Sequence, residues 1–179
     1  MHHIVSDGWS MGVLVHEVAS IYEALAEGQP VPLPELPVQY ADFAAWQREW
    51  VKSEGIQTQL EGLRARFTGA PALELPADTV RPAARTIRGG SHFFTLPPEL
   101  VAELETLARK EGATLFMVLL AAFEVLVSRY SGQQDFCVGS PVAQRTRSEL
   151  EPLIGFFVNT LVLRARVDGN PTFSELVSR

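Results

Sequence analysis

A segment rich in proline and glycine divides this sequence into two parts and limits the folds open to it. Residues 69–90 hold three prolines, three glycines and three arginines, and they show little apolar periodicity. Proline fixes the backbone φ angle and lacks an N–H donor, so such a segment continues neither a helix nor a central strand. The sequence therefore predicts two structured parts, residues 1–68 and 91–179, joined by a linker at 69–90.

The first part is predicted to be mainly helical. Ser10 can cap a helix whose apolar residues recur at helical spacing, and Gly28 stands where a left-handed residue would end it. Four prolines between residues 30 and 37 predict an extended segment. The elements expected here are a strand end at Ile4–Val5, a turn at 6–8, and helices over 11–27, 39–53 and 58–67.

The second part mixes helices and strands. Thr114 can cap an apolar helix, and the second half of the run Leu153–Val167 alternates apolar and charged residues, which is typical of a strand with one wet face. The elements expected here are strands at 91–96, 136–139 and 153–167, helices over 98–110 and 115–130, and a final helix opened by Thr172 or Ser174. The predicted fold class is therefore α+β.

The composition argues against several classes of protein. The 179 residues include 15 Lys and Arg against 21 Asp and Glu, which gives a formal net charge of -6. Nucleic acid is not expected as a partner, because phosphate contacts need clustered cations. We interpret two arginine groups, one at 81, 85 and 88 and one at 145 and 147, as solvated loop residues. A single cysteine, Cys137, fits a reducing compartment.

The sequence predicts neither secretion nor a membrane partner. No signal peptide is visible at the start of the chain. The most apolar stretch, Leu115–Val127, contains Glu124 and is too short to cross a bilayer, so we interpret it as a buried core helix. We expect a cytoplasmic protein.

The opening segment concentrates the residue types that carry chemistry. His2 and His3 are adjacent at an expected strand end, so their side chains point to opposite faces. Asp7 follows His3 by a short turn, and it can either accept the His3 Nδ1–H or organise the turn by accepting other donors. A neutral imidazole beside a cleft can take up a proton near neutral pH. Acyl transfer, proton abstraction and metal binding all stay open at this point.

Metal binding is the weakest of these alternatives. Two adjacent histidines cannot easily chelate one ion together, since they face opposite ways. The other histidines, His16 and His92, are distant in the sequence, and the carboxylates near them show no ligand spacing. We therefore expect no metal site.

Three motifs resemble those of one family and follow in its order. Residues 2–8, HHIVSDG, resemble the HHxxxDG signature of the condensation domains of nonribosomal peptide synthetases, which belong to the chloramphenicol acetyltransferase-like acyltransferases. Residues 40–46, YADFAAW, resemble the family's YxDFAxW motif, and residues 154–161, IGFFVNTL, resemble its GxFVNT motif. The resemblance implies a two-lobe α+β fold, of which this chain holds the end of the N-terminal lobe at 1–68 and the start of the C-terminal lobe at 91–179.

The resemblance also implies a reaction. Such domains form a peptide bond when the amine of an acceptor aminoacyl thioester attacks the carbonyl of a donor acyl or peptidyl thioester. No metal or directly bound cofactor takes part, and both substrates hang on phosphopantetheine arms that belong to carrier proteins. The implied partners are upstream and downstream peptidyl carrier domains and a neighbouring adenylation domain. The implied context is the biosynthesis of antibiotics and other secondary metabolites.

Residue roles follow from the resemblance position by position. His3 and Gly8 are the expected catalytic residues: His3 would deprotonate or orient the amine, and the Gly8 N–H would lie near the thioester oxygen. His2, Asp7 and Trp9 are expected to support the site, and Tyr40 and Asn159 are possible lining residues of the substrate tunnel. The usual arginine partner of Asp7 is expected in a part of the family domain that this chain lacks.

Two alternative functions stay open. The chain can belong to a module that only docks a carrier or recruits an enzyme, or to a coenzyme A-dependent acyltransferase of the HxxxDG type. The docking module is disfavoured because His3, Asp7 and Gly8 are intact. The coenzyme A-dependent acyltransferase is disfavoured by the motifs at residues 40–46 and 154–161. Because the chain is less than half of a complete family domain, we expect it to be inactive by itself.

Overall fold

The computed structural model describes residues 1–79, 84 and 89–179. It divides into two compact units, one made of Met1–Thr68 and Gly139–Val162 and the other of Gly69–Val138 and Leu163–Arg179. The division after Thr68 falls where the sequence places the start of the linker. Residues 139–162 group with the first unit, because hydrogen bonds join their loop to the loop before the first helix. The expected arginines at 81, 85 and 88 lie outside the described residues.

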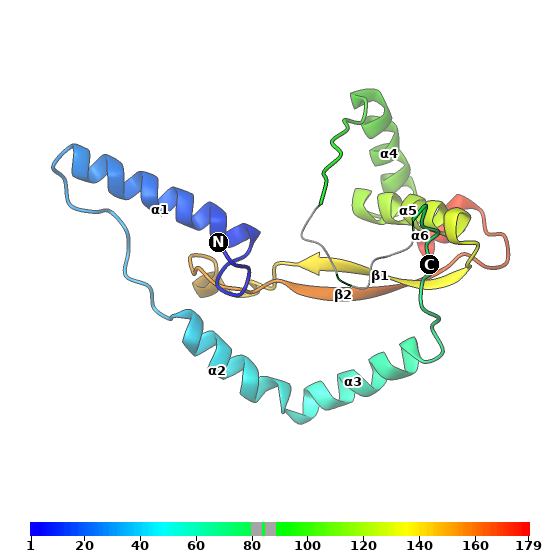
Figure 1. Cartoon of the computed structure of the whole chain (residues 1–179), viewed down its shortest axis with the longest axis horizontal. Helices are drawn as coiled ribbons and strands as arrows, with labels where there is room; N and C mark the ends of the chain where they lie inside the picture. Colours follow the sequence, from blue (N-terminus) through cyan, green and yellow to red (C-terminus); the bar gives the residue numbers. More distant parts are fainter. Residues whose placement is uncertain (80–83, 85–88) are drawn as a thin grey trace. The chain divides into compact units, whose positions relative to one another are not determined.

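Three helices of the first unit confirm the helical predictions. They are α1 (Gly8–Ala26), α2 (Tyr40–Val51) and α3 (Glu54–Phe67), and Figure 1 shows them in chain order. Gly28 has a left-handed φ of 68°, as expected for a residue that ends α1. The starts of α1 and α3 were predicted too late. Asp7 rather than Ser10 is the N-cap of α1, and α3 begins at Glu54 rather than at residue 58. The buried core of this unit consists of Phe43, Leu150, Leu153 and Phe157.

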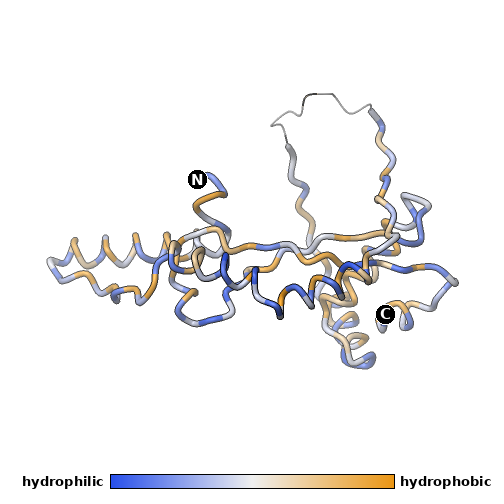
Figure 2. The backbone as a smooth tube through the Cα atoms, turned by 90° about the horizontal axis from the view of Figure 1, so that it is seen from below, coloured by the Kyte–Doolittle hydropathy of each residue, from blue (hydrophilic) through white to orange (hydrophobic). Residues whose placement is uncertain are grey.

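The helices of the second unit also follow local sequence signals. They are α4 (Pro98–Lys110), α5 (Leu115–Ser131) and the short α6 (Phe173–Ser178), and α5 packs against both others. The Thr114 hydroxyl accepts the Met117 N–H at 3.3 Å, and Thr172 caps α6. Figure 2 shows hydrophobic positions repeated along the helices. The core between α4, α5 and α6 consists of Ala108, Val118, Ala121, Leu176 and Val177.

Two strands, β1 (Asp135–Val142) and β2 (Asn159–Arg166), form a two-stranded sheet. Asp135 bonds Arg164, and Gly139 lies against Thr160, so the residue numbers rise along one strand as they fall along the other. The pairing is therefore antiparallel. The short 3₁₀ helix η1 (Ser148–Leu150) lies in the connection between the strands.

Two predicted strands are wrong, and a third was predicted too long. Ile4–Val5 and residues 91–97 are irregular, and the long run from Leu153 becomes a strand only at Asn159. A β pattern needs a neighbouring strand to satisfy its backbone, and the described residues place none beside these segments. Phe93 and Phe94 are accordingly exposed.

Among the described residues, no helix by itself has the length and hydropathy to cross a bilayer. The pair α4 and α5 meets that test only when both are taken together, and the chain bends by 103° between them.

Candidate functional site

The loop that carries the two histidines ends in a buried N-cap. Asp7 has extended backbone, and its Oδ1 accepts the Ser10 backbone N–H at 2.8 Å. Gly8 is thus the first helical residue of α1. Its φ is not left-handed and a Cβ there would meet no atom within 4 Å, so neither backbone conformation nor packing in this chain demands glycine. The space beside Gly8 is open.

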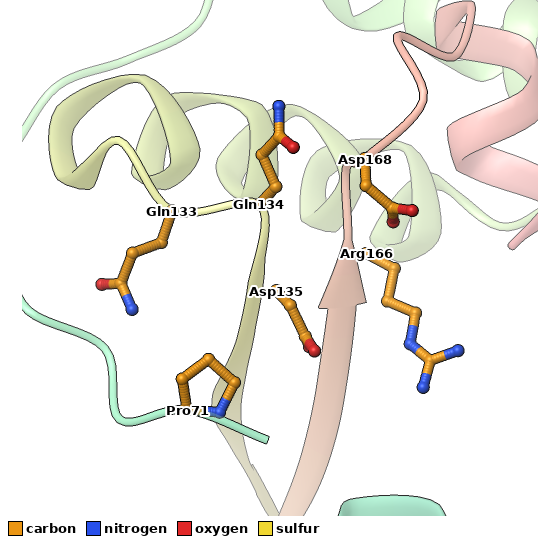
Figure 3. Close-up of a pocket in the computed structure, with 6 residues that line it drawn as sticks. All are labelled: Pro71, Gln133, Gln134, Asp135, Arg166 and Asp168. Carbon is orange, nitrogen blue, oxygen red and sulfur yellow. The ribbon is translucent and has the colours of Figure 1, made fainter. Parts of the chain in front are cut away.

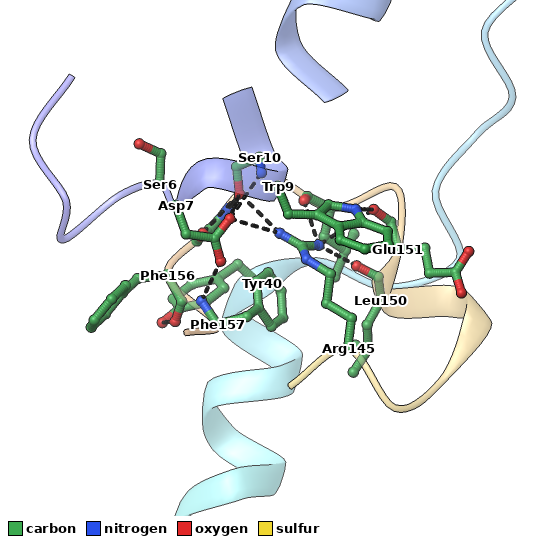
Figure 4. A network of polar contacts seen from close by, with 12 residues as sticks. Ser6, Asp7, Trp9, Ser10, Tyr40, Arg145, Leu150, Glu151, Phe156 and Phe157 are labelled. Carbon is green, nitrogen blue, oxygen red and sulfur yellow. Dashed lines mark hydrogen bonds and ion pairs between the residues drawn. The ribbon is translucent and has the colours of Figure 1, made fainter. Parts of the chain in front are cut away.

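The Asp7 carboxylate joins three segments that are distant in the sequence. Its Oδ1 also accepts the Ser10 hydroxyl at 2.7 Å, and its Oδ2 accepts the Phe157 backbone N–H at 3.0 Å. Arg145 Nη2 lies 3.4 Å from Oδ1, and the side chains of Asp7 and Arg145 are 0% and 1% exposed. Figure 4 shows these groups converging on the start of α1. Of the two roles predicted for Asp7, the structure therefore shows the organising one.

Arg145 corrects two expectations. It is a buried partner of Asp7 within this chain, although we expected that partner elsewhere and interpreted Arg145 as a solvated loop residue. Its guanidinium donates to the carbonyl oxygens of Leu150 and Leu153, the latter at 2.8 Å, and covers the Phe157 ring at 4.0 Å. Arg147, by contrast, is exposed as expected. Arg145 thus holds the loop between β1 and β2 against the loop of the histidines.

Ser10 is a second residue of this network, and the sequence indicated it only as a helix cap and not as a site residue. Its hydroxyl oxygen accepts from Arg145 Nη2 at 2.9 Å and from the Gly155 backbone N–H at 3.1 Å. The hydroxyl proton has two possible acceptors, Asp7 Oδ1 at 2.7 Å and the Gly155 carbonyl at 2.8 Å. The first and third sequence motifs are therefore joined through one buried hydroxyl. A helix-cap position beside an aspartate is the only sequence signal that could have identified it.

The ionisation of Asp7 makes the stability of this site depend on pH. Burial by itself would raise the pKa of the Asp7 carboxyl, but hydrogen bonds from Ser10 and Phe157 and the Arg145 charge outweigh burial and hold that pKa below its ordinary value. As the pH falls, the unfolded chain therefore takes up the proton first, near pH ~4. The stabilisation is complete above that value and is lost as the pH falls through the folded-state pKa.

We therefore expect the free energy of unfolding to fall below about pH 4, and to fall less steeply in Asp7→Asn. Urea titrations between about pH 7 and pH 3 on a domain that carries this chain measure both slopes. Equal slopes in the two proteins would contradict this account of Asp7.

The two histidines differ in which ring nitrogen is used. His3 Nδ1 lies 2.7 Å from the Ser6 carbonyl oxygen, which can only accept, so Nδ1 carries the proton. The Nε2 of a neutral His3 is then the acceptor, and the side chain is exposed. His2 has the opposite arrangement, because its Nδ1 accepts the Ile4 N–H at 3.0 Å. His3, and not His2, therefore keeps a lone pair available for a substrate proton.

The remaining predicted site residues take structural contacts. Trp9 Nε1 donates to the Glu151 carbonyl at 3.0 Å, and the Tyr40 hydroxyl donates to the Phe156 carbonyl at 3.0 Å. Asn159 is exposed at the start of β2, where its side chain accepts the Thr160 N–H at 2.8 Å. Trp9 and Tyr40 thus hold the loop of the third motif, and the tunnel-lining role of Tyr40 and Asn159 stays a prediction.

Gly155 makes room for Tyr40, which links the second motif to the third. A Cβ at Gly155 would overlap the Tyr40 ring, with Cε2 only 2.8 Å away. We expect Gly155→Ala to lower the free energy of unfolding by about 1–3 kcal/mol through overpacking. Gly62 is the matched control, because it lies within α3 with open space around it, and Gly62→Ala should raise stability by up to ~1 kcal/mol. Equal effects of the two substitutions in urea denaturation would exclude steric overlap at Gly155.

No group of His, Cys, Asp and Glu among the described residues could hold a metal ion. Figure 3 shows a polar pocket in the second unit, far in sequence from the histidine loop. It is lined by Pro71, Gln133, Gln134, Asp135, Arg166 and Asp168, and it contains none of the predicted site residues.

Comparison of the sequence with known proteins gives one consistent family. The pattern of the family described as Condensation domain matches residues 1–179. One of the proteins that make up the linear gramicidin synthase of Brevibacillus parabrevis is 54% identical over 180 residues, which cover 100% of this chain and 2% of that protein.

Two solved structures have similar folds. The first condensation domain of the CDA synthetase superposes with a TM-score of 0.79 and 27% identity, covering 99% of this chain and 39% of that one. The X-domain in complex with OxyB, from teicoplanin biosynthesis, superposes with a TM-score of 0.90 and 29% sequence identity. This match covers 100% of this chain and 41% of the X-domain chain. This chain therefore spans about two-fifths of these solved chains.

Proposed function

The chain belongs to the condensation-domain family, and we propose that it supplies the histidine loop of a domain that forms peptide bonds in a nonribosomal peptide synthetase. The observation that carries the proposal is the state of His3. Its Nδ1–H is fixed on the Ser6 carbonyl, which leaves an accessible Nε2 lone pair. The Asp7 carboxylate, which orders the loop, is buried and its oxygens accept hydrogen bonds from within the chain. Its role is therefore to stabilise the loop rather than to bind substrate.

The proposed reaction joins two thioester substrates presented by carrier domains. The acceptor amine nitrogen forms a bond to the donor carbonyl carbon, and the C–S bond of the donor breaks. The amine loses a proton and the leaving thiolate gains one. His3 Nε2 is placed to accept the amine proton or to orient the amine, and one imidazole can serve both transfers. The Gly8 N–H, at the start of α1 with open space beside it, would stabilise negative charge on the carbonyl oxygen.

The partners follow from this reaction. Donor and acceptor carrier domains would bring the substrates on phosphopantetheine arms, an adenylation domain would load the acceptor, and the synthetase would work in the cytoplasm. The reaction as proposed needs no metal ion. Lobe boundaries at 1–68 and 91–179 stay predictions.

A second function has one observation in its favour. The X-domain that superposes with a TM-score of 0.90 was solved in complex with OxyB, so a domain of this fold can hold another protein. Recruitment without catalysis does not need a histidine with a free Nε2, and the geometry of His3 therefore favours the enzyme.

The test is peptide-bond formation by a complete condensation domain that carries this chain. Donor-loaded and acceptor-loaded carrier domains are mixed with it, and the product on the acceptor carrier is measured by mass spectrometry. We expect product with the complete domain and none with the 179-residue chain alone. Product from acyl-coenzyme A in place of the donor carrier would instead support the coenzyme A-dependent alternative. Absence of product combined with tight binding of another protein would support recruitment.

A further inference from the structure

The His3 imidazole touches a second residue besides its carbonyl partner. The rings of His3 and Phe156 lie edge to face, with centroids 4.9 Å apart and planes at 68°. A single hydrogen bond at Nδ1 leaves the imidazole free to turn about that bond, whereas a ring packed against its side limits the turn. Edge-to-face aromatic pairs are a favoured arrangement, so this contact also selects one orientation of the imidazole.

The position of Phe156 is determined by both of its neighbours and by Tyr40. The Phe156 carbonyl accepts the Tyr40 hydroxyl at 3.0 Å, and the Phe157 N–H donates to Asp7 at 3.0 Å. On the other side, the Gly155 backbone bonds the Ser10 hydroxyl. The backbone of Phe156 is thus fixed from the second motif and from the first, while its ring stays 41% exposed beside His3. Figure 4 shows Phe156 directed away from the buried network around Arg145.

We propose that Phe156 is a positioning residue for His3. Its ring packs against the imidazole and keeps the Nε2 lone pair directed toward the reacting amine. The proposal deepens the proposed function and rests on it. Phe156 itself need not touch the reacting atoms. Its effect comes through the orientation of His3, because a general base must lie within hydrogen-bond reach of the proton that it takes.

The test replaces the ring in a complete domain that carries this chain. In Phe156→Leu, kcat should fall roughly 3- to 10-fold, the size of one lost aromatic contact, with KM for both carriers unchanged. Phe156→Tyr keeps the ring and should restore kcat to within about 2-fold of the wild-type value. If Phe156→Leu does not fold by circular dichroism, Phe156→Met removes the same ring.

A spectroscopic signature separates positioning from a general structural effect. Nitrogen-15 NMR of the His3 imidazole should show the Nδ1–H tautomer in the wild type. In Phe156→Leu it should show a mixture of both tautomers, because a ring that is no longer held from the side also leaves the Ser6 carbonyl for part of the time. The matched control is Phe94→Leu, because Phe94 also lies beside a histidine, His92, with ring centroids 6.2 Å apart and a 76% exposed side chain. It should change neither kcat nor the His3 signal.

Three outcomes overturn the proposal: unchanged kcat and tautomer in Phe156→Leu, a loss that Phe156→Tyr does not restore, or a loss confined to KM. The proposed function is tested separately by His3→Ala. If that variant stays active, the catalytic role of His3 fails, whereas the tautomer measurement still decides whether Phe156 orients the ring.

Discussion

Replacing His3 by alanine in a complete condensation domain that carries this chain should lower kcat for peptide-bond formation by about 10²- to 10⁴-fold. That range is the usual contribution of a positioned general acid or base. His3 is the only one of the two loop histidines whose acceptor nitrogen is not used by the loop itself. The measurement is single-turnover transfer between loaded carrier domains, followed by mass spectrometry of the acceptor carrier.

The matched variant for this experiment is His2→Ala. Because His2 Nδ1 accepts the Ile4 N–H, its loss should loosen the loop and reduce activity less than the loss of His3. Carrier binding, measured by titration calorimetry, should survive His3→Ala, since the interactions of the His3 side chain with Ser6 and Phe156 are local to the site. Equal losses in both variants would point to loop disorder rather than proton transfer. Full activity of His3→Ala would exclude His3 both as the general base and as the group that orients the amine.

The helices could be predicted from sequence because their signals are local. Thr114 caps α5 through an atom of residue 117, and Gly28 ends α1 through its own backbone conformation. Each signal lies within a few residues of the structure that it determines. At the start of α1, Ser10 was predicted in place of Asp7 because both residues are good caps and the choice depends on contacts outside the helix.

The strands were harder because a strand is defined by its partner. Residues 91–96 and 153–158 have apolar, β-rich sequences, yet neither pairs with a described segment. Within one run, only the half from Asn159 forms a strand, and it does so opposite β1. This half is also the part of the run in which apolar and charged residues alternate, as expected for a strand with one solvated face.

The site was predictable in its motifs and not in its connections. The histidines, Asp7 and Gly8 could be identified from one short segment, whereas Arg145 lies 138 residues from Asp7 and Gly155 lies 145 from Ser10. Arginines in polar loops are usually solvated, so nothing nearby distinguishes Arg145 from the exposed Arg147. What distinguishes it is the set of carbonyl oxygens and the aromatic face that the fold brings to it.

The buried pair of Asp7 and Arg145 should contribute the largest stability effect of any side chain in the site. Arg145→Met and Asp7→Asn should each lower the free energy of unfolding by about 3–5 kcal/mol, because each leaves a buried charge without its partner. Arg145→Met should be the worse of the two, since it also removes donors from the carbonyls of Leu150 and Leu153. Urea or guanidinium denaturation of the complete domain at neutral pH measures both.

The double variant Arg145→Met/Asp7→Asn measures how much of the lost free energy of unfolding comes from the interaction between the two side chains. The direct contact of 3.4 Å is longer than the 2.8 Å of the bond from Arg145 to Leu153 and the 2.7 Å of that from Ser10 to Asp7. The double variant should therefore recover only about 1–3 kcal/mol relative to the sum of the single ones. Glu49→Gln removes an exposed pair, in which Lys52 and Glu49 are 64% and 72% exposed, and should cost no more than ~1 kcal/mol. If Arg145→Met cost as little as that control, its guanidinium would be solvated, and the connection between the first and third motifs would rest on the Ser10 hydroxyl and on the bond from the Phe157 N–H to Asp7.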